Sequence, residues 1–232
     1  MKAQRLRVRF RVEKEAAELP PREMSRAWEE AAINGGLPLA YSEGRRRTPQ
    51  VSLAAPLPRG VTSDCELADL ALEARVRPAD ALGALNAHLP PGIEASAAWG
   101  VGLASASLPM QVRWADYEAA VPAGTDRLRV QRAIDELLAS ATFPWEHHRE
   151  TKVRRYDLRP LVIDAAIEGE EDGCLILLLR LRAEQESSAR GDQVIAALDL
   201  PPACRIHRRR LHLESVQPAV TAFRRAGEPD SG

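Results

Sequence analysis

RLRVRFRVE, residues 5–13, is the stretch that decides how this chain is expected to fold. Apolar residues at the even positions alternate with arginines at the odd positions, Arg5, Arg7, Arg9 and Arg11. Successive side chains of a strand point to opposite faces of the sheet, so this period of two predicts a half-buried strand. Its inner face is apolar and its outer face consists of arginine.

The elements after this strand predict the first half of the molecule. A helix over 21–35 begins at a proline, keeps apolar residues at helical spacing and stops at a Gly-Gly pair. A second helix begins at Pro78 and ends before the Pro-Pro-Gly run at 90–92. Further strands are expected at 37–41, 50–55, 65–75 and 93–99. The resulting order, β-α-β-β-α-β, is the ferredoxin-like arrangement, in which two helices cover one face of an antiparallel sheet.

The same order of elements recurs after a small-residue linker at 100–109. Helices are predicted over 126–140 and 191–199, and extended segments over 111–121, 143–153, 161–168, 174–182 and 204–214. We therefore expect an α+β fold of two tandem ferredoxin-like (βαββαβ) domains with antiparallel sheets, at 1–103 and 104–215. The tail, 216–232, is rich in proline, glycine and small residues and is predicted to be disordered.

Composition sets the broad class of the protein. The 232 residues carry a formal net charge of -1, yet the cations are almost all arginine, with lysine only at Lys2, Lys14 and Lys152. No apolar run is long enough to span a membrane, and the polar N-terminus does not resemble a signal peptide. Three widely spaced cysteines give no disulfide framework. We expect a cytoplasmic protein with no membrane partner.

Several chemistries lack their sequence motifs. Cys-x3-Cys-x2-Cys, which would hold the iron–sulfur cluster of a radical SAM enzyme, does not occur, so the chain is not expected to be such an enzyme. Phosphate-binding glycine loops and the Gly-x-Ser-x-Gly nucleophile motif do not occur either. The only hint of a zinc site is Cys204-x2-His207, with His147 and His148 elsewhere in the chain, and a buried thiol with surface imidazoles is the favoured interpretation. We expect no metal, no cofactor and no catalytic residue.

Clustered arginine is the positive signal. Arginine forks match phosphate geometry, and positive charge gathered on one face is typical of nucleic-acid binding. The predicted anion- or RNA-binding residues are Arg5, Arg7, Arg9, Arg11, Arg45, Arg46, Arg47, Arg154, Arg155 and Arg208. Aromatic candidates for base stacking lie beside them, at Tyr41, Trp145 and Tyr156. The alternative is a solvated face whose arginines are balanced by carboxylates of neighbouring strands, such as Glu66, Asp69 and Glu73.

Three segments carry a family resemblance: LPLAYSEGRRRTPQVSLAAPLPRGVTS at 37–63, VRRYDLRPLV at 153–162 and RIHRRRLHLE at 205–214. Over about residues 4–214 the chain resembles the uncharacterised radical SAM-linked proteins (DUF2344-type), which are found beside or fused to a radical SAM enzyme. The motif residues are Tyr41, Ser42, Gly44, Pro49, Pro58, Gly60, Asp157, Arg159 and Pro160. The resemblance implies a radical SAM enzyme as partner.

The chain departs from the family pattern at two histidines. Where the family turn usually continues Phe-Asn-Pro-His-Pro, this chain has three arginines, then Thr48 and Pro49. Where the family has Ser-His-Leu-Asp near the first helix, this chain has the run Pro-Pro-Arg-Glu at 20–23. Any site built from those two histidines is therefore missing, and the chain resembles a divergent member.

These observations lead to one main hypothesis and two alternatives. The main hypothesis is a non-catalytic accessory protein of a radical SAM enzyme that binds or presents an RNA substrate through its arginines. One alternative is a stand-alone RNA-processing or RNA-modifying enzyme that uses His147, His148 or His207. The other is a scaffold whose arginines bind an acidic protein. The substrate and the stoichiometry do not follow from the sequence.

Overall fold

A computed structural model describes residues 2–45, 47–122, 124, 126–149 and 152–214. The predicted disordered tail and Arg46 lie outside these residues. None of the described helices is long and apolar enough to cross a membrane.

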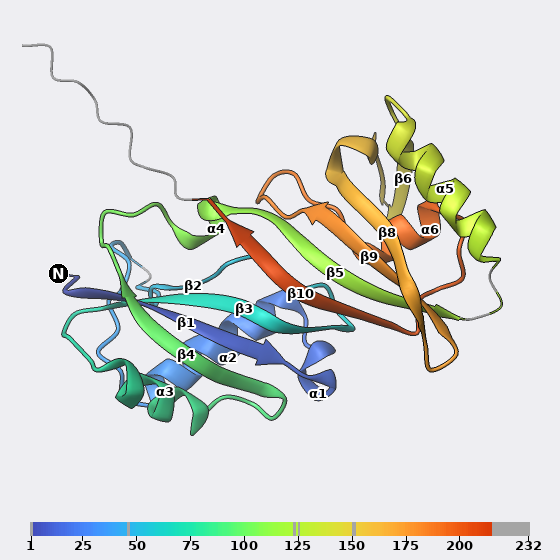
Figure 1. Ribbon diagram of the computed structural model, residues 1–232. Helices are drawn as coiled ribbons and strands as arrows, with labels where there is room; N and C mark the ends of the chain where they lie inside the picture. The colour runs from blue at the N-terminus through green and yellow to red at the C-terminus, as the bar shows by residue number, and fades with distance from the viewer. Residues whose placement is uncertain (1, 46, 123, 125, 150–151, 215–232) are drawn as a thin grey trace, which may run out of the picture.

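The architecture is α+β, as predicted, and its centre is one large, mostly antiparallel sheet (Figure 1). The strands follow the order β4 (Ile93–Val101), β1 (Gln4–Val12), β3 (Val61–Leu72), β10 (Arg205–Leu213), β5 (Val112–Pro122), β9 (Cys174–Arg182) and β8 (Val162–Glu171). A short strand, β2 (Val51–Leu53), also pairs with β3. All neighbours are antiparallel except β3 and β10, which run parallel through three residue pairs beginning at Val61 and Ile206.

Helices cover one face of this sheet at each end. In the first half these are α1 (Lys14–Ala17), α2 (Pro21–Asn34) and α3 (Pro78–Asn86); in the second half they are α5 (Arg127–Ala139) and α6 (Gly191–Ala197). A one-turn helix, α4 (Leu108–Gln111), precedes β5, and a two-stranded hairpin of β6 (Pro144–Arg149) and β7 (Lys152–Asp157) stands apart from the main sheet. A short 3-10 turn, Arg159–Leu161, leads into β8. The sheet surface opposite the helices is called the open face below.

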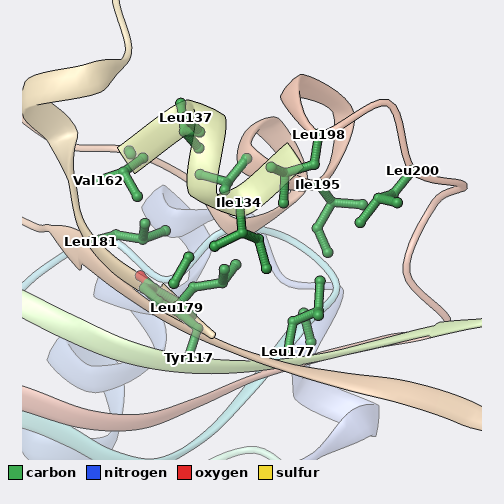
Figure 2. Packing of buried hydrophobic residues seen from close by; sticks show 14 of the residues in the cluster. Tyr117, Ile134, Leu137, Val162, Leu177, Leu179, Leu181, Ile195, Leu198 and Leu200 are labelled. Carbon is green, nitrogen blue, oxygen red and sulfur yellow. The ribbon is translucent and has the colours of Figure 1, made fainter. Parts of the chain in front are cut away.

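Each half has its own apolar core on the helix-covered face. In the first half the even-numbered side chains of β1 pack on α2, where Phe10 and Trp28 meet with ring centroids 4.6 Å apart. In the second half Tyr117 and alternate leucines of β9 pack on α5 and α6, as Figure 2 shows for Leu177, Leu179 and Ile134. The alternation along β1 therefore placed its apolar face correctly.

The two halves have the same strand order. The first half reads β4-β1-β3-β2 and the second reads β10-β5-β9-β8, because β10 is the fourth main-sheet strand of its half. The parallel pairing of β3 with β10 joins them into a continuous sheet. The division into two tandem ferredoxin-like domains, with a boundary at 103/104, stays a prediction.

Candidate nucleic-acid interface

The four arginines of β1 divide into an inner pair, Arg5 and Arg7, which is covered by other residues, and an outer pair, Arg9 and Arg11, which lies at the surface. Arg7 is only 6% exposed, and its guanidinium donates to both carboxylate oxygens of Asp69, at 2.7 and 3.0 Å, and to Gln111 at 3.2 Å. Arg5 lies 3.6 Å from Asp69 and donates to the backbone carbonyls of Ser105 and Ala106. The expectation of a continuous exposed arginine face is therefore wrong for Arg7 and is limited for Arg5.

The physical reason is the segment that connects the two halves. Residues 102–111 leave β4 and cross the open face of β1, where the carbonyls of Ser105 and Ala106 and the side chain of Gln111 bind the two arginines. Strand alternation predicts which face a side chain occupies, but it does not show what covers that face. Asp69, one of the carboxylates that the sequence predicts to balance the row, does so for Arg5 and Arg7.

The outer pair stays at the surface. Arg11 is half exposed and pairs with Glu94 at 2.5 Å and Glu13 at 3.2 Å. The side chain of Arg9 is exposed and, within the described part of the chain, forms no ion pair. Surface pairs such as those of Arg11 contribute at most ~1 kcal/mol and are screened by salt. An anionic ligand can therefore displace them at low cost.

Arg208 lies in the interior where the two halves join. It is 1% exposed; Nη1 contacts both Glu66 oxygens at 3.1 Å, Nε donates to the Tyr117 hydroxyl and Nη2 donates to the Pro56 carbonyl. Burial is the largest single influence on Arg208 and by itself would lower its pKa, but Glu66, Tyr117 and Cys65 together outweigh it, so the pKa is raised and the guanidinium stays charged. Arg208 is therefore a connector between β10, β3 and β5, and the prediction that it lies on a binding surface is wrong.

A mostly apolar groove borders this connector. A cavity of about 360 Å³ lies between α2 and the segment after β2, lined by residues that include Met24, Leu53 and Ala55. A second cavity of about 300 Å³ shares Ala55 and Pro56 with it and extends to Arg208 and Arg190. Residues 56–58 of the resemblance segment 37–63 thus form part of the wall of a groove at the junction of the halves.

The loop over 41–49 holds two exposed arginines of the resemblance segment 37–63, Arg45 and Arg47; we name it the arginine loop. Its base is closed by an isolated bridge between Tyr41 and Pro49, and by Ser42, whose Oγ accepts from the Thr48 backbone N–H at 3.0 Å. Gly44 has a φ of +119°, a backbone conformation that residues with a Cβ rarely adopt. Ser42, Gly44 and Pro49 therefore shape the loop.

Charge and aromatic surface meet in this loop. Arg45 and Arg47 are exposed, and neither has a carboxylate partner among the residues that the structure describes. The guanidinium carbon of Arg47 lies 5.7 Å from the centroid of the Tyr41 ring, and Tyr41 itself is 36% exposed. Exposed guanidinium groups beside an accessible aromatic ring suit a phosphate and a stacked base.

The remaining motif residues have structural roles. Gly60, at a φ of +79°, donates its N–H to the Ala17 carbonyl, and the Pro58 carbonyl accepts from Val61. Arg159 donates twice to the Leu138 carbonyl near the end of α5 and once to the Val162 carbonyl.

Asp157 completes the turn around Pro160. Its carboxylate accepts from the backbone N–H of Phe143 and of Arg159, while the Pro160 carbonyl accepts from Arg182. Asp157 and Arg159 thus hold α5, the base of the hairpin and β8 together.

The β6–β7 hairpin carries the third arginine cluster. Arg155 is exposed and pairs with Glu146 at 2.6 Å, across the strands. The side chain of Arg154 and those of His147 and His148 lie outside the described ones, so the predictions for them stay predictions. Trp145 and Tyr156, predicted as stacking residues, pack against the second core at the base of the hairpin. That placement favours a structural role for both rings.

The titratable residues outside these clusters are largely engaged. His207 has Nδ1 at 2.8 Å from Thr62 Oγ1 and Nε2 at 3.2 Å from an Asp64 oxygen. All three cysteines are free thiols, and burial, followed by the charge of Glu66, raises the pKa of Cys65 to about 11. Among the described residues no group of three or more His, Cys, Asp or Glu side chains is placed to hold a metal ion.

The sequence analysis did not predict a cluster of charged residues on the open face of the second half, formed by Asp116, Arg180 and His212. Asp116 accepts from Arg180 at 2.7 and 3.2 Å, and one of its oxygens lies 2.7 Å from His212 Nε2. Burial would raise the pKa of Asp116, but the hydrogen bonds from Arg180 and His212 outweigh it, and the net shift is downward. Alternation along 111–121 and 174–182 could have placed these residues on one face, but only strand order makes them neighbours.

A comparison with family models matches residues 5–190 to the family described as "Uncharacterized protein conserved in bacteria (DUF2344)". The chain belongs to this family. The family assignment agrees with the resemblance seen in the sequence, while a link to radical SAM enzymes is not part of it. The match includes the arginine loop and the hairpin and ends before α6 and β10.

Curated proteins and solved structures add little to this assignment. No curated protein matches the chain. Among solved structures it is similar to a chain of a Cbf5-Nop10-Gar1 complex, with a TM-score of 0.42, 12% identity and coverage of 87% of this chain and 57% of that one. It is also similar to the first two RRM domains of yeast poly(U) binding protein (Pub1), with a TM-score of 0.21, 8% identity and coverage of 88% and 98%. Both TM-scores are low, so neither likeness shows what this DUF2344 chain binds.

Proposed function

We propose that this protein is a non-catalytic accessory protein of a radical SAM enzyme and that it binds or presents RNA through its exposed arginines. The enzyme partner rests on the sequence resemblance. We further propose that each half is a ferredoxin-like domain, on the basis of their shared strand order, and that the protein acts in the cytoplasm, where its three free cysteines would stay reduced.

The observation that carries the RNA proposal is the arginine loop. Arg45 and Arg47 are exposed without a carboxylate partner among the described residues, and Arg47 lies over the accessible ring of Tyr41. Phosphate contacts supply most of the affinity of sequence-independent RNA binding, and stacking of a base on an aromatic ring adds to it. Arg7 and Arg208 are excluded from the binding surface, because each is buried against a carboxylate.

RNA affinity tests this proposal most simply. Binding of a fluorescently labelled single-stranded RNA is measured by anisotropy at several salt concentrations, starting at about 50 mM, where phosphate contacts are strongest. The change is Arg45→Ala/Arg47→Ala. The matched control is Arg127→Ala/Arg132→Ala on α5, which removes the same charge from two exposed arginines that have no ion pair in the described part of the chain.

The loop variant should bind RNA more weakly, and its plot of log affinity against log salt should be shallower by about 1.4, since each lost single-strand phosphate contact removes ~0.7. The control should keep the wild-type slope. Equal slopes in all three proteins would refute the loop as the binding site. RNA cleavage by the purified protein that disappears in His147→Ala/His148→Ala would replace the accessory role with the enzymatic alternative.

The enzyme partner needs a separate test. The protein is expressed together with a neighbouring gene product that carries Cys-x3-Cys-x2-Cys, and the two are purified through a tag on one of them. Co-elution at a fixed ratio supports the accessory role. Complete separation at low salt, with both proteins folded, contradicts it.

A further inference from the structure

A second charged site lies on the open face of the second half, around a hollow of about 430 Å³. Arg180, Arg209 and Arg210 line it together with Asp116 and Asp164, and Leu178 and Ala166 provide apolar surface. The hollow extends over four neighbouring strands, β10, β5, β9 and β8, and the strand register shifts on two sides of it, at Arg208/Arg210 and at Val162/Asp164.

A β-bulge creates the arginine pair of this hollow. Arg208 pairs with Tyr117 and Arg210 pairs with Asp116, the next residue of β5, so Arg209 is an extra residue in β10. Without the extra residue, alternation would send Arg209 and Arg210 to opposite faces. Both instead line the same hollow on the open face. Bulges are frequent next to functional sites because they redirect side chains in this way.

The two arginines keep part of their binding capacity. Asp116 lies opposite Arg210 in register, but its oxygens already accept from Arg180 and contact His212. Arg210 consequently has no ion pair among the residues that the structure describes. Arg209 contacts Glu168 and Glu118 only at 3.4 and 3.6 Å. An incoming phosphate would meet two adjacent guanidinium groups without having to break a close ion pair.

The other groups of the hollow suit the rest of a nucleotide. Arg210, Asp116, Arg180 and Asp164 form a row across four strands, in which donors alternate with acceptors. A carboxylate accepts hydrogen bonds from hydroxyl groups, and that is what a ribose offers. His212 lies beside Asp116, and its ring stacks on Trp114 with centroids 5.3 Å apart. This aromatic pair provides surface for a base at the end of the row.

We propose that this hollow binds the phosphate of a ribonucleotide, through Arg209 and Arg210, with Asp164 accepting from the ribose. The phosphate comes either from a free nucleotide or from single-stranded RNA; in the second case the site rests on the proposed function and adds a contact point for the RNA. It differs from the arginine loop in its half of the molecule, its strands and its residues.

Two probes distinguish the sources. Calorimetric titration with AMP, with adenosine as the phosphate-free comparison, tests a free nucleotide. Anisotropy with labelled decauridylate tests RNA. The change is Arg209→Ala/Arg210→Ala, which alters exposed side chains only, and an unchanged thermal midpoint verifies folding. Arg127→Ala/Arg132→Ala is again the matched control, and Arg210→Lys keeps the charge while it removes the planar fork.

The site predicts a loss of at least about tenfold in affinity in the double variant, since charge-assisted hydrogen bonds are lost, and a smaller loss in Arg210→Lys. Loss of AMP binding, with adenosine not bound, identifies a free nucleotide; loss of decauridylate binding alone identifies RNA. Wild-type affinity of the double variant for both probes overturns the site. If Arg45→Ala/Arg47→Ala then still weakens RNA binding, the proposed function survives this failure; if it does not, both fail.

Discussion

Replacing Arg208 by methionine should destabilise the whole molecule, because Arg208 joins three strands at the junction of the halves. Methionine fits the space of the side chain but leaves the Glu66 carboxylate, 3% exposed, without its two contacts at 3.1 Å. The Tyr117 hydroxyl and the Pro56 carbonyl lose a donor as well. Removing one partner of a buried ion pair costs about 3–5 kcal/mol. For a chain of this size that corresponds to a fall in melting temperature of roughly 6–20 °C.

Urea unfolding followed by circular dichroism measures this loss. The second variant, Arg208→Met/Glu66→Leu, removes both charges and should recover most of the stability, because a buried pair adds little over apolar residues of similar size. Arg205→Ala is the exposed control on the same strand and should cost less than about 1 kcal/mol, since Arg205 is half exposed and its partner Glu118 keeps its contact with Arg209. A loss below about 1 kcal/mol in Arg208→Met would refute the connector role. Equal losses in the single and double variants would show that packing, and not charge, dominates.

The other interior contacts predict further outcomes. Arg7→Met should lower the free energy of unfolding by about 3–5 kcal/mol in urea unfolding, since it leaves Asp69 buried without its partner. The same variant should not change the salt slope of RNA binding, and a changed slope would show that Arg7 contacts the RNA. Arg159→Ala should cost about 1–3 kcal/mol through the lost contacts to the Leu138 and Val162 carbonyls, with RNA affinity unchanged. At pH 8 a thiol with a pKa of about 11 is ionised to only about one part in a thousand, so iodoacetamide should modify exposed Cys204 long before Cys65. Because the pKa of Cys65 is raised, the contribution of this thiol to stability is lost as the pH rises from the usual thiol range towards 11. Modification of Cys65 and Cys204 at equal rates, measured by mass spectrometry, would contradict the burial of Cys65.

Local patterns predicted the elements closely. The expected helix at 21–35 is α2, the strand at 174–182 coincides with β9, and the helix beginning at Pro78 is α3. These segments have strong periodicity and clear start or stop residues. The extended segment expected at 143–153 contains β6 and the first residues of β7, so it forms a hairpin with the residues that follow it rather than a single strand.

Contacts between segments that are distant in the chain could not be predicted from the sequence. The pairing of β3 with β10 joins residues about 145 positions apart, and no sequence pattern in either strand predicts this pairing. That pairing buries Arg208, and the connecting segment at 102–111 covers Arg7, so arginines that looked alike in sequence differ in exposure. Arg45 and Arg47 are exposed, as is usual for arginines of a polar loop, and their predicted role in anion binding stays a prediction.

The central claim is that exposed arginines of this chain bind RNA, and the salt dependence of RNA affinity tests it most directly. In the wild-type protein, the affinity for labelled single-stranded RNA should fall as salt rises. The plot of log affinity against log salt should have a slope of about −1.4 or steeper, which corresponds to two or more phosphate contacts. A slope near zero, or no binding at about 50 mM salt, would contradict the claim and leave an acidic protein as the partner for the arginines.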